Sequence, residues 1–125
     1  MNKRTTLELL AFILESISLI NKRFMGIQSS DDFLANDENL TKMEAILMRL
    51  QASGEAIKNL YKRDQEFLLL VAQSSYWSEL IRFRDLLSHH YTDIQADIVF
   101  DICQNELHEL EMKILQLKEK IDEIK

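Results

Sequence analysis

Glycine and proline are scarce in this chain, and that scarcity limits what it can fold into. Its 125 residues include only two glycines, Gly26 and Gly54, and no proline. Sheet proteins need many tight turns, and tight turns depend on these two residue types. We therefore expect long helices with few connections, and hydrophobic residues, 46% of the chain, are numerous enough for a core. A chain of this length is expected to form a single domain, residues 1–125.

Apolar residues at helical spacing predict four main helices. The first opens at a capping box that begins with Thr5, and it ends near Gly26. A polar loop over residues 28–37 leads to the second helix, residues 38–61. Gly54 lies inside this second helix, where glycine costs about 1 kcal/mol relative to alanine. We therefore expect another backbone to approach the helix closely at Gly54.

The middle of the chain predicts a buried connection and a third helix. Residues 67–72 are all apolar, so we expect them to be buried. Ser75 is the expected N-cap of the third helix, residues 76–89. Thr92 then opens a second capping box, which predicts a break between the third and fourth helices.

The fourth helix carries a heptad stripe of apolar residues at alternating spacings of four and three. The stripe consists of Cys103, Leu107, Leu110, Ile114, Leu117, Ile121 and Ile124. Such a stripe packs against another helix at a shallow angle. The sequence as a whole therefore predicts an all-α fold, an antiparallel four- to five-helix bundle.

The charge of the chain limits which partners it can bind. Its formal net charge of −6 argues against a broad nucleic-acid surface but allows a small local basic site. Cys103 is the only cysteine, so no intrachain disulfide can form, which fits a reducing, cytoplasmic compartment. The apolar stretch after Lys3 and Arg4 is interrupted by Glu8 and Glu15, which predicts an amphipathic helix and not a signal peptide. No stretch approaches the ~18 uninterrupted apolar residues of a membrane span, so no membrane partner is expected.

One segment, residues 84–91, has the form R-x-x-x-x-H-x-Y. On a straight helix, at about 100° per residue, Arg84 and His89 diverge by roughly 140°, whereas Arg84 and Tyr91 lie within about 20° of each other. Arg84 and His89 therefore converge on one point only if the helix ends or bends near residues 88–90. Alternatively, they converge across a two-fold axis, with each protomer supplying part of the site.

The residue types in this segment fit the cleavage of RNA by its own 2′-hydroxyl. That reaction requires a base for the hydroxyl proton and positive charge beside the phosphate. Histidine titrates near neutral pH, so His89 can serve as the base, and the planar guanidinium of Arg84 matches phosphate oxygens. Asp85 precedes His89 by four residues, so it can accept a hydrogen bond from the imidazole if the helix persists. This chemistry requires no metal ion and no cofactor.

The same segment resembles the signature of the HEPN superfamily, and its final tyrosine resembles that of the HepT branch. Gly54, Glu55 and Ala56, followed by Lys58, are similar to a Gly-Glu-Ala-x-Lys segment of that branch. The resemblance covers roughly residues 40–110. It implies a four- or five-helix bundle that forms homodimers, in which the paired motifs line a shared cleft.

The resemblance also implies a function. Active members of the family are metal-independent endoribonucleases, toxins of toxin–antitoxin pairs, which implies Arg84 and His89 as the catalytic pair and RNA as the substrate, with tRNA suggested by analogy. The implied partner is an MntA-type nucleotidyltransferase, the antitoxin, which transfers AMP from ATP to the tyrosine, here Tyr91. The bulky anionic adduct would block the cleft and repel RNA phosphates. The chain departs from the family at Asp85, where asparagine is usual, and it lacks the proline common before the motif helix.

Other interpretations of these residues remain open. Glu55, Ser88 and His90 are candidate supporting residues, although His90 is also expected as a solvent-facing neighbour of the site. A metal site finds little support, because one cysteine and the absence of an H-E-x-x-H pattern leave no recognisable ligand set. A second hypothesis is a non-catalytic helical partner of a separate nucleotidyltransferase. A third is a purely structural dimer built on the C-terminal heptads.

Overall fold

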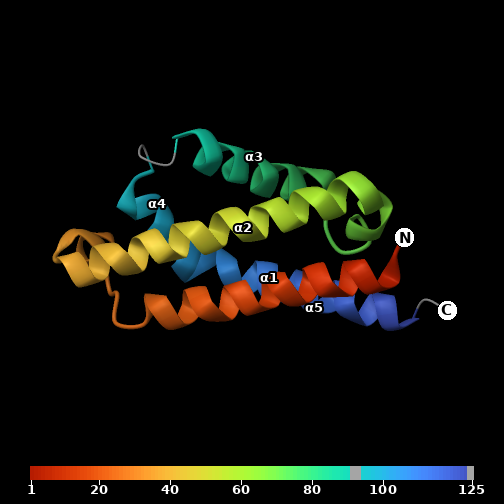
Figure 1. Ribbon diagram of the computed structural model, residues 1–125, viewed down its shortest axis with the longest axis horizontal. Helices are drawn as coiled ribbons and strands as arrows, with labels where there is room; N and C mark the ends of the chain where they lie inside the picture. Colours follow the sequence, from red (N-terminus) through yellow and green to blue (C-terminus); the bar gives the residue numbers. More distant parts are fainter. Residues whose placement is uncertain (91–93, 124–125) are drawn as a thin grey trace.

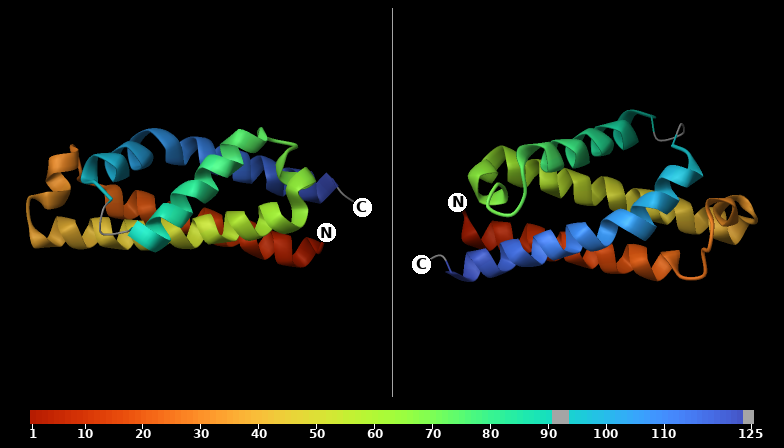
Figure 2. Two further views of the ribbon diagram at one scale, coloured as in Figure 1. Left: turned by 90° about the horizontal axis from the view of Figure 1, so that it is seen from above. Right: turned by 180° about the vertical axis from the view of Figure 1, so that it is seen from behind.

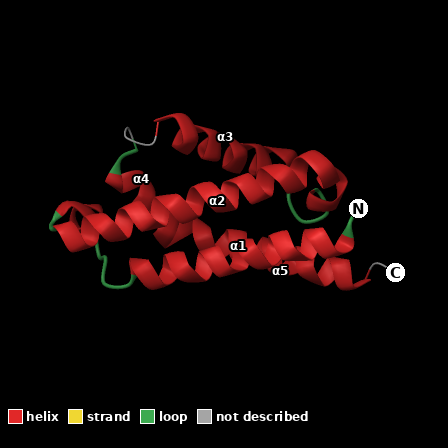
Figure 3. Ribbon diagram, in the orientation of Figure 1, coloured by secondary structure: helices red, strands yellow, loops and turns green. Residues whose placement is uncertain are grey.

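Every regular element in the described part of the chain is a helix. The computed structural model describes residues 1–90 and 94–123, with only the main chain of His90. The elements are α1 (Lys3–Phe24), the 3-10 helix η1 (Ser30–Leu34), α2 (Asp37–Leu68), α3 (Ser74–His90), α4 (Ala96–Asp101), the π-helix η3 (Ile102–Glu106) and α5 (Leu107–Glu123) (Figure 1, Figure 3). Because α4, η3 and α5 follow one another without interruption, they form one rod, and the described chain makes four main helices. The predicted all-α bundle is confirmed.

The central helix of the bundle is α2. It packs against α1 on one side and α3 on another, and α5 packs against α1 (Figure 1, Figure 2). The main neighbour of α3 within the described chain is α2. The position of α3, which carries the R-x-x-x-x-H segment, therefore depends chiefly on its contact with α2.

The heptad stripe of the last helix forms part of the core. Its six described members are Cys103, Leu107, Leu110, Ile114, Leu117 and Ile121, and all are buried. Ile124, the last predicted member, lies outside the described residues. Because the stripe is covered from within the chain, it does not offer a surface for a second copy, and the hypothesis of a dimer built on these heptads is wrong.

Two predicted helix starts differ from the structure. Asn2, not Thr5, caps α1: its side-chain oxygen accepts a hydrogen bond from the Thr5 backbone nitrogen at 3.0 Å. Asparagine is at least as good an N-cap as threonine, and starting at Lys3 extends the helix. Similarly, α3 already begins at Ser74, so Ser75 lies inside the helix. The predicted cap at Thr92 lies outside the described residues.

The second helix is longer than its apolar pattern predicts. It continues to Leu68 through a kink at Asp64, where φ is −135° and ψ is 50°. The prediction that residues 67–72 are all buried is wrong, because Leu69 and Leu70 are 40% and 60% exposed. A helix end and the turn that follows it present only one side to the core, and Phe67 and Leu68 occupy that side.

No helix in residues 1–90 and 94–123 is both long enough and apolar enough to cross a membrane.

Candidate active site

The site begins at a close contact between α2 and α3. A Cβ atom added at Gly54 would lie 2.5 Å from Cβ and 2.7 Å from Cγ of Arg84, and 3.6 Å from its Cα. Real Cβ atoms do not approach other atoms so closely, so the position requires glycine. The expected close approach at Gly54 is confirmed, and the part of α3 that makes it is Arg84 itself.

Arg84 continues from this contact into a network of charged side chains. Its guanidinium pairs with Glu55 of α2, and its Nη1 donates to Oδ1 of Asp85 at 3.0 Å. The same Asp85 oxygen accepts from Nζ of Lys58 at 3.2 Å. One turn further along α3, Ser88 accepts from Nε2 of Gln51 at 3.2 Å. These contacts join α2 to α3 through two cations and two carboxylates, whose formal charges cancel.

Asp85 is held in its ionised form by this network. Hydrogen bonds from Arg84 and then from Lys58 lower the pKa of its carboxyl group below the usual value. The sequence offered a different partner, His89, but among the described side chains Asp85 accepts from Arg84 and Lys58. The carboxylate therefore positions the arginine and does not orient the imidazole.

The third helix ends at His90, within the predicted range of residues 88–90, and residues 91–93 lie outside the described part of the chain. α3 remains helical through His90, because buried Leu87 and the bond from Gln51 to Ser88 hold its last turns against α2. His89 is exposed at this end of the helix. Residues four apart on a helix are neighbours, so His89 lies on the same flank of α3 as Asp85.

The arginine reaches that flank by its side chain and not by a bend in the backbone. Its Cβ faces Gly54 in the contact with α2, whereas its Nη1 reaches Asp85. The guanidinium is therefore held, within a single chain, by the residue four positions before the exposed His89.

Two residues of the predicted site, and one predicted helix cap, fall outside what the structure describes. The side chain of His90 is not described, and Tyr91 and Thr92 lie outside the described residues.

Gln51 and Lys58 join α2 to the α3 residues of the site, but the sequence alone assigned them no role there. The available signal for Lys58 was its place in the Gly-Glu-Ala-x-Lys segment, four residues after Gly54, where α2 and α3 make a close contact.

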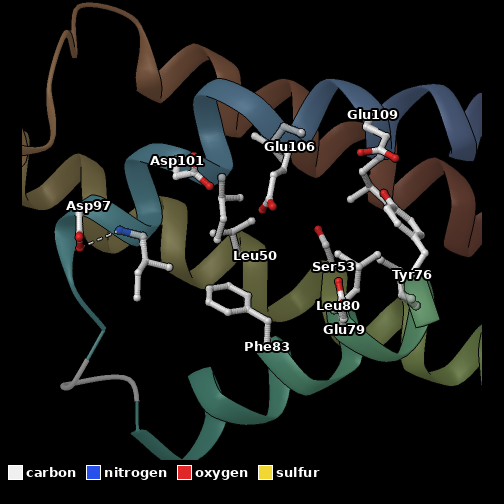
Figure 4. Close-up of a pocket in the computed structure, with 16 residues that line it drawn as sticks. Leu50, Ser53, Tyr76, Glu79, Leu80, Phe83, Asp97, Asp101, Glu106 and Glu109 are labelled. Atoms are coloured by element: carbon white, nitrogen blue, oxygen red, sulfur yellow. Dashed lines mark hydrogen bonds between the residues drawn. The ribbon is translucent and has the colours of Figure 1, made fainter.

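A cavity on the opposite flank of α3 has an acidic lining. It encloses about 500 Å³ between α2, α3 and the α4–η3–α5 rod (Figure 4). Its lining is largely apolar and includes five carboxylates: Glu79, Asp97, Asp101, Glu106 and Glu109. Burial and three of the neighbouring carboxylates raise the pKa of Glu106. Such a lining disfavours an anionic ligand.

No cluster of metal-ligating side chains occurs in the part of the chain that the structure describes.

Substituting Gly54 with alanine should separate α2 from α3. Overpacking typically lowers the free energy of unfolding by about 1–3 kcal/mol, whereas the better helix propensity of alanine raises it by up to about 1 kcal/mol. We expect a lower urea midpoint, because the added methyl group collides with Arg84 at the contact between the two helices. The double variant Gly54→Ala with Arg84→Gly removes the opposing Cβ and should relieve the collision, although the new glycine itself costs about 1 kcal/mol of helix stability. Equal midpoints for wild type and Gly54→Ala would contradict the close contact.

Sequence comparisons identify relatives of this chain. Residues 13–117 match the model of the family described as "Ribonuclease HepT-like". The chain is 32% identical over 111 residues to a protein named "Putative RNase" from Caldanaerobacter subterraneus subsp. tengcongensis, a match that covers 89% of this chain and 92% of the relative. A second "Putative RNase", from Methanocaldococcus jannaschii, is 32% identical over 84 residues, which cover 67% of this chain and 64% of the relative.

A further relative in Methanocaldococcus jannaschii is a longer protein. It is named "Gamma-glutamylcyclotransferase and putative RNase" and is 28% identical over 113 residues. The match covers 90% of this chain but only 47% of that protein, so the chain spans about half of its length. No solved structure gives a significant match to the chain.

Proposed function

Because the chain belongs to the HepT-like ribonuclease family, we propose that it is a toxin that cleaves RNA internally, in the cytoplasm and without a metal ion. One observation carries the proposal. The Arg84 guanidinium is tied to Asp85, one helical turn from exposed His89 on the same flank of α3. The attack of a 2′-hydroxyl on its own phosphate requires a base for the proton and a positive charge at the phosphate, which His89 and Arg84 can supply.

In the proposed reaction, His89 accepts the proton of the 2′-hydroxyl. The 2′-oxygen forms a bond to phosphorus, and the bond from phosphorus to the 5′-oxygen breaks. The products are a 2′,3′-cyclic phosphate and a 5′-hydroxyl, whose proton comes from solvent. Arg84 stabilises the charge that develops on the phosphate oxygens, as a guanidinium does through its planar pair of donors.

We propose that Glu55 and Asp85 act by positioning Arg84. Glu55 pairs with the guanidinium from α2, and Asp85 pairs with it from α3. Both carboxylates also oppose the approach of a phosphate, because they neutralise the cation that should bind it. Substrate phosphate must therefore compete with them for the arginine.

This neutralisation is also the observation that favours the second candidate function, a non-catalytic partner of a nucleotidyltransferase. A cleavage assay with purified protein and RNA separates the two. The nuclease proposal expects cleavage by wild type and strong loss in Arg84→Ala and in His89→Ala. Equal behaviour of all three proteins would reject the assigned site. No cleavage by any, together with co-purification of the nucleotidyltransferase and no growth arrest on overexpression, would select the non-catalytic function.

We further propose that AMP transfer to Tyr91 silences the toxin. In this step the tyrosine oxygen forms a bond to the α-phosphorus of ATP, pyrophosphate leaves, and the hydroxyl proton passes to solvent. Tyr91 belongs to the same R-x-x-x-x-H-x-Y segment as His89, and a bulky anionic adduct in this segment would repel RNA phosphates. Intact mass after co-expression with an MntA-type nucleotidyltransferase should increase by AMP units in wild type and remain unchanged in Tyr91→Phe.

The family resemblance also implies a homodimer whose two motifs face a shared cleft, and we retain this as a proposal. Mixing inactive Arg84→Ala with inactive His89→Ala protein tests it. If each protomer supplies part of one site, the mixture should regain activity. If each chain carries a complete site, the mixture should remain inactive.

Asp85→Asn should strengthen RNA binding and speed cleavage. Asparagine keeps an oxygen that accepts from Arg84, but it removes one negative charge from a cluster that is neutral in total. We expect an affinity gain on the order of fivefold, as for about 1 kcal/mol between charges near a surface. Glu79→Gln removes a carboxylate from the opposite flank of α3 and should change binding little. Weaker binding by Asp85→Asn, or the same gain in both variants, would contradict this assignment.

A further inference from the structure

A second, open cleft lies between α2 and α3 on the flank that carries Asp85. It has a volume of about 470 Å³, and its charged lining consists of Lys58, Lys62 and Arg82, with Asp85 as the single carboxylate among the described residues. We call it the basic cleft. Lys62 and Arg82 are exposed, and neither forms an ion pair with any residue that the structure describes. Their positive charge is therefore available to an anion from outside.

The basic cleft shares Asp85, the partner of Arg84, with the candidate active site. Ser78, Arg82, Asp85 and His89 occur at successive spacings of four, three and four residues, which place them along one stripe of α3. The other wall is α2, whose Lys58 bonds to Asp85 at 3.2 Å. An extended anion lying in the cleft would thus pass from Lys62 and Arg82 to the network that holds Arg84 and then to His89.

Charge on the two flanks of α3 differs in sign. Within residues 1–90 and 94–123, the cavity on the opposite flank has five carboxylates in its lining and no cationic side chain, whereas the basic cleft has three cations and one carboxylate. The chain as a whole carries a formal charge of −6. A polyanion is therefore repelled by most of the surface and drawn to this flank, since local fields steer charged ligands.

We propose that the basic cleft binds the phosphates of RNA next to the cleaved one, with Lys62 and Arg82 as the phosphate contacts. Lys58 completes the cleft while it pairs with Asp85. This inference rests on the proposed ribonuclease function and names the surface that holds its substrate. Phosphate contacts position the strand without reading its sequence, so the cleft contributes affinity and register.

The test measures RNA binding and not cleavage. The probe is a fluorescent 2′-O-methyl RNA of about 12 nucleotides, which lacks the attacking hydroxyl and stays intact on wild-type protein. Binding is followed by anisotropy over a range of salt concentrations for wild type and for the double variant Lys62→Ala/Arg82→Ala. A matched control, Lys22→Ala/Lys118→Ala, removes the same charge from exposed positions on α1 and α5. Thermal melts check that all proteins are folded.

We expect the cleft variant to bind RNA more weakly by on the order of tenfold. Its salt slope should decrease by about 0.7 for each RNA phosphate that the variant no longer neutralises. The control should bind within about twofold of wild type. Equal weakening in the two double variants would show a net-charge effect only and overturn the proposal, as would unchanged binding by the cleft variant. Failure of the nuclease proposal is distinguishable, because it would appear as no cleavage at all, or as cleavage that does not depend on Arg84 or His89, whatever the binding result.

Discussion

Replacing His89 with alanine should lower RNA cleavage by about 100- to 10,000-fold, the range that a positioned general base contributes. The loss should be in the chemical step, because the imidazole accepts the proton of the attacking hydroxyl. His89 is exposed at the end of α3, so the free energy of unfolding should change by less than about 0.5 kcal/mol. Single-turnover cleavage rates and urea unfolding of the same preparations measure both effects.

The chain offers a matched control in His108. Its side chain is 82% exposed on α5, and its Nδ1 lies 4.0 Å from Oε1 of Glu111. His108→Ala removes the same group from another surface and should leave cleavage unchanged. Equal loss in the two variants, or full activity of His89→Ala, would remove His89 from the mechanism.

The largest effect on stability is expected from Trp77→Ala, at about 3–5 kcal/mol. Trp77 is fully buried, and its Nε1 donates to the backbone oxygen of Leu68 at 3.0 Å. The substitution removes the ring from the core and leaves that oxygen without its partner. Because α3 packs chiefly on α2, we expect the damage to be concentrated there, with α3 released before the rest of the bundle unfolds. Hydrogen exchange of the α3 amides and urea unfolding measure this.

Trp77→Phe separates the two contributions of the ring. Phenylalanine fills much of the same space but cannot donate to Leu68, so its cost should lie well below that of alanine. Cleavage by Trp77→Ala should be weak even though Arg84 and His89 are intact, because their helix is no longer fixed on α2. Normal cleavage by a variant whose α3 amides exchange freely would contradict the dependence of the site on this contact.

Much of the fold follows from local pattern in the sequence. The heptads from Cys103 to Ile121 require a buried stripe on one helix, and the structure buries all six described members. Gly54 inside a helix indicated a close contact, which Arg84 provides. The predictions that were wrong depended on a choice between sequence signals of similar strength. Asn2 and Thr5 are both good caps, and the exposure of Leu69 and Leu70 depends on where α2 ends.

The candidate site was less accessible to sequence reasoning. The residues of the motif share one helix, so their types and spacing could be recognised directly. Their arrangement could not, because it is set by side chains from α2. Glu55 and Lys58 pair with residues of α3 that lie almost thirty positions away. Helical angles give only the direction in which the side chain of Arg84 leaves the helix. The side chain is long, and its guanidinium reaches Asp85 without a bend in the backbone.

The same reason explains why the two flanks of α3 were not foreseen. Lys62 and Arg82 come from different helices, and so do the carboxylates of the large cavity. Only the packing of α3 on α2 brings each set together. The formal net charge of −6 does not indicate how positive and negative side chains are distributed over the surface.

The most direct test of the account is the chemistry of the RNA ends after cleavage in the presence of a chelator. An imidazole and a guanidinium acting on the 2′-hydroxyl and its phosphate must leave a 2′,3′-cyclic phosphate and a 5′-hydroxyl. We expect these ends with wild-type protein in excess EDTA, and none with Arg84→Ala or His89→Ala. Ends that carry a 3′-hydroxyl and a 5′-phosphate, or cleavage that disappears with the chelator, would contradict the account.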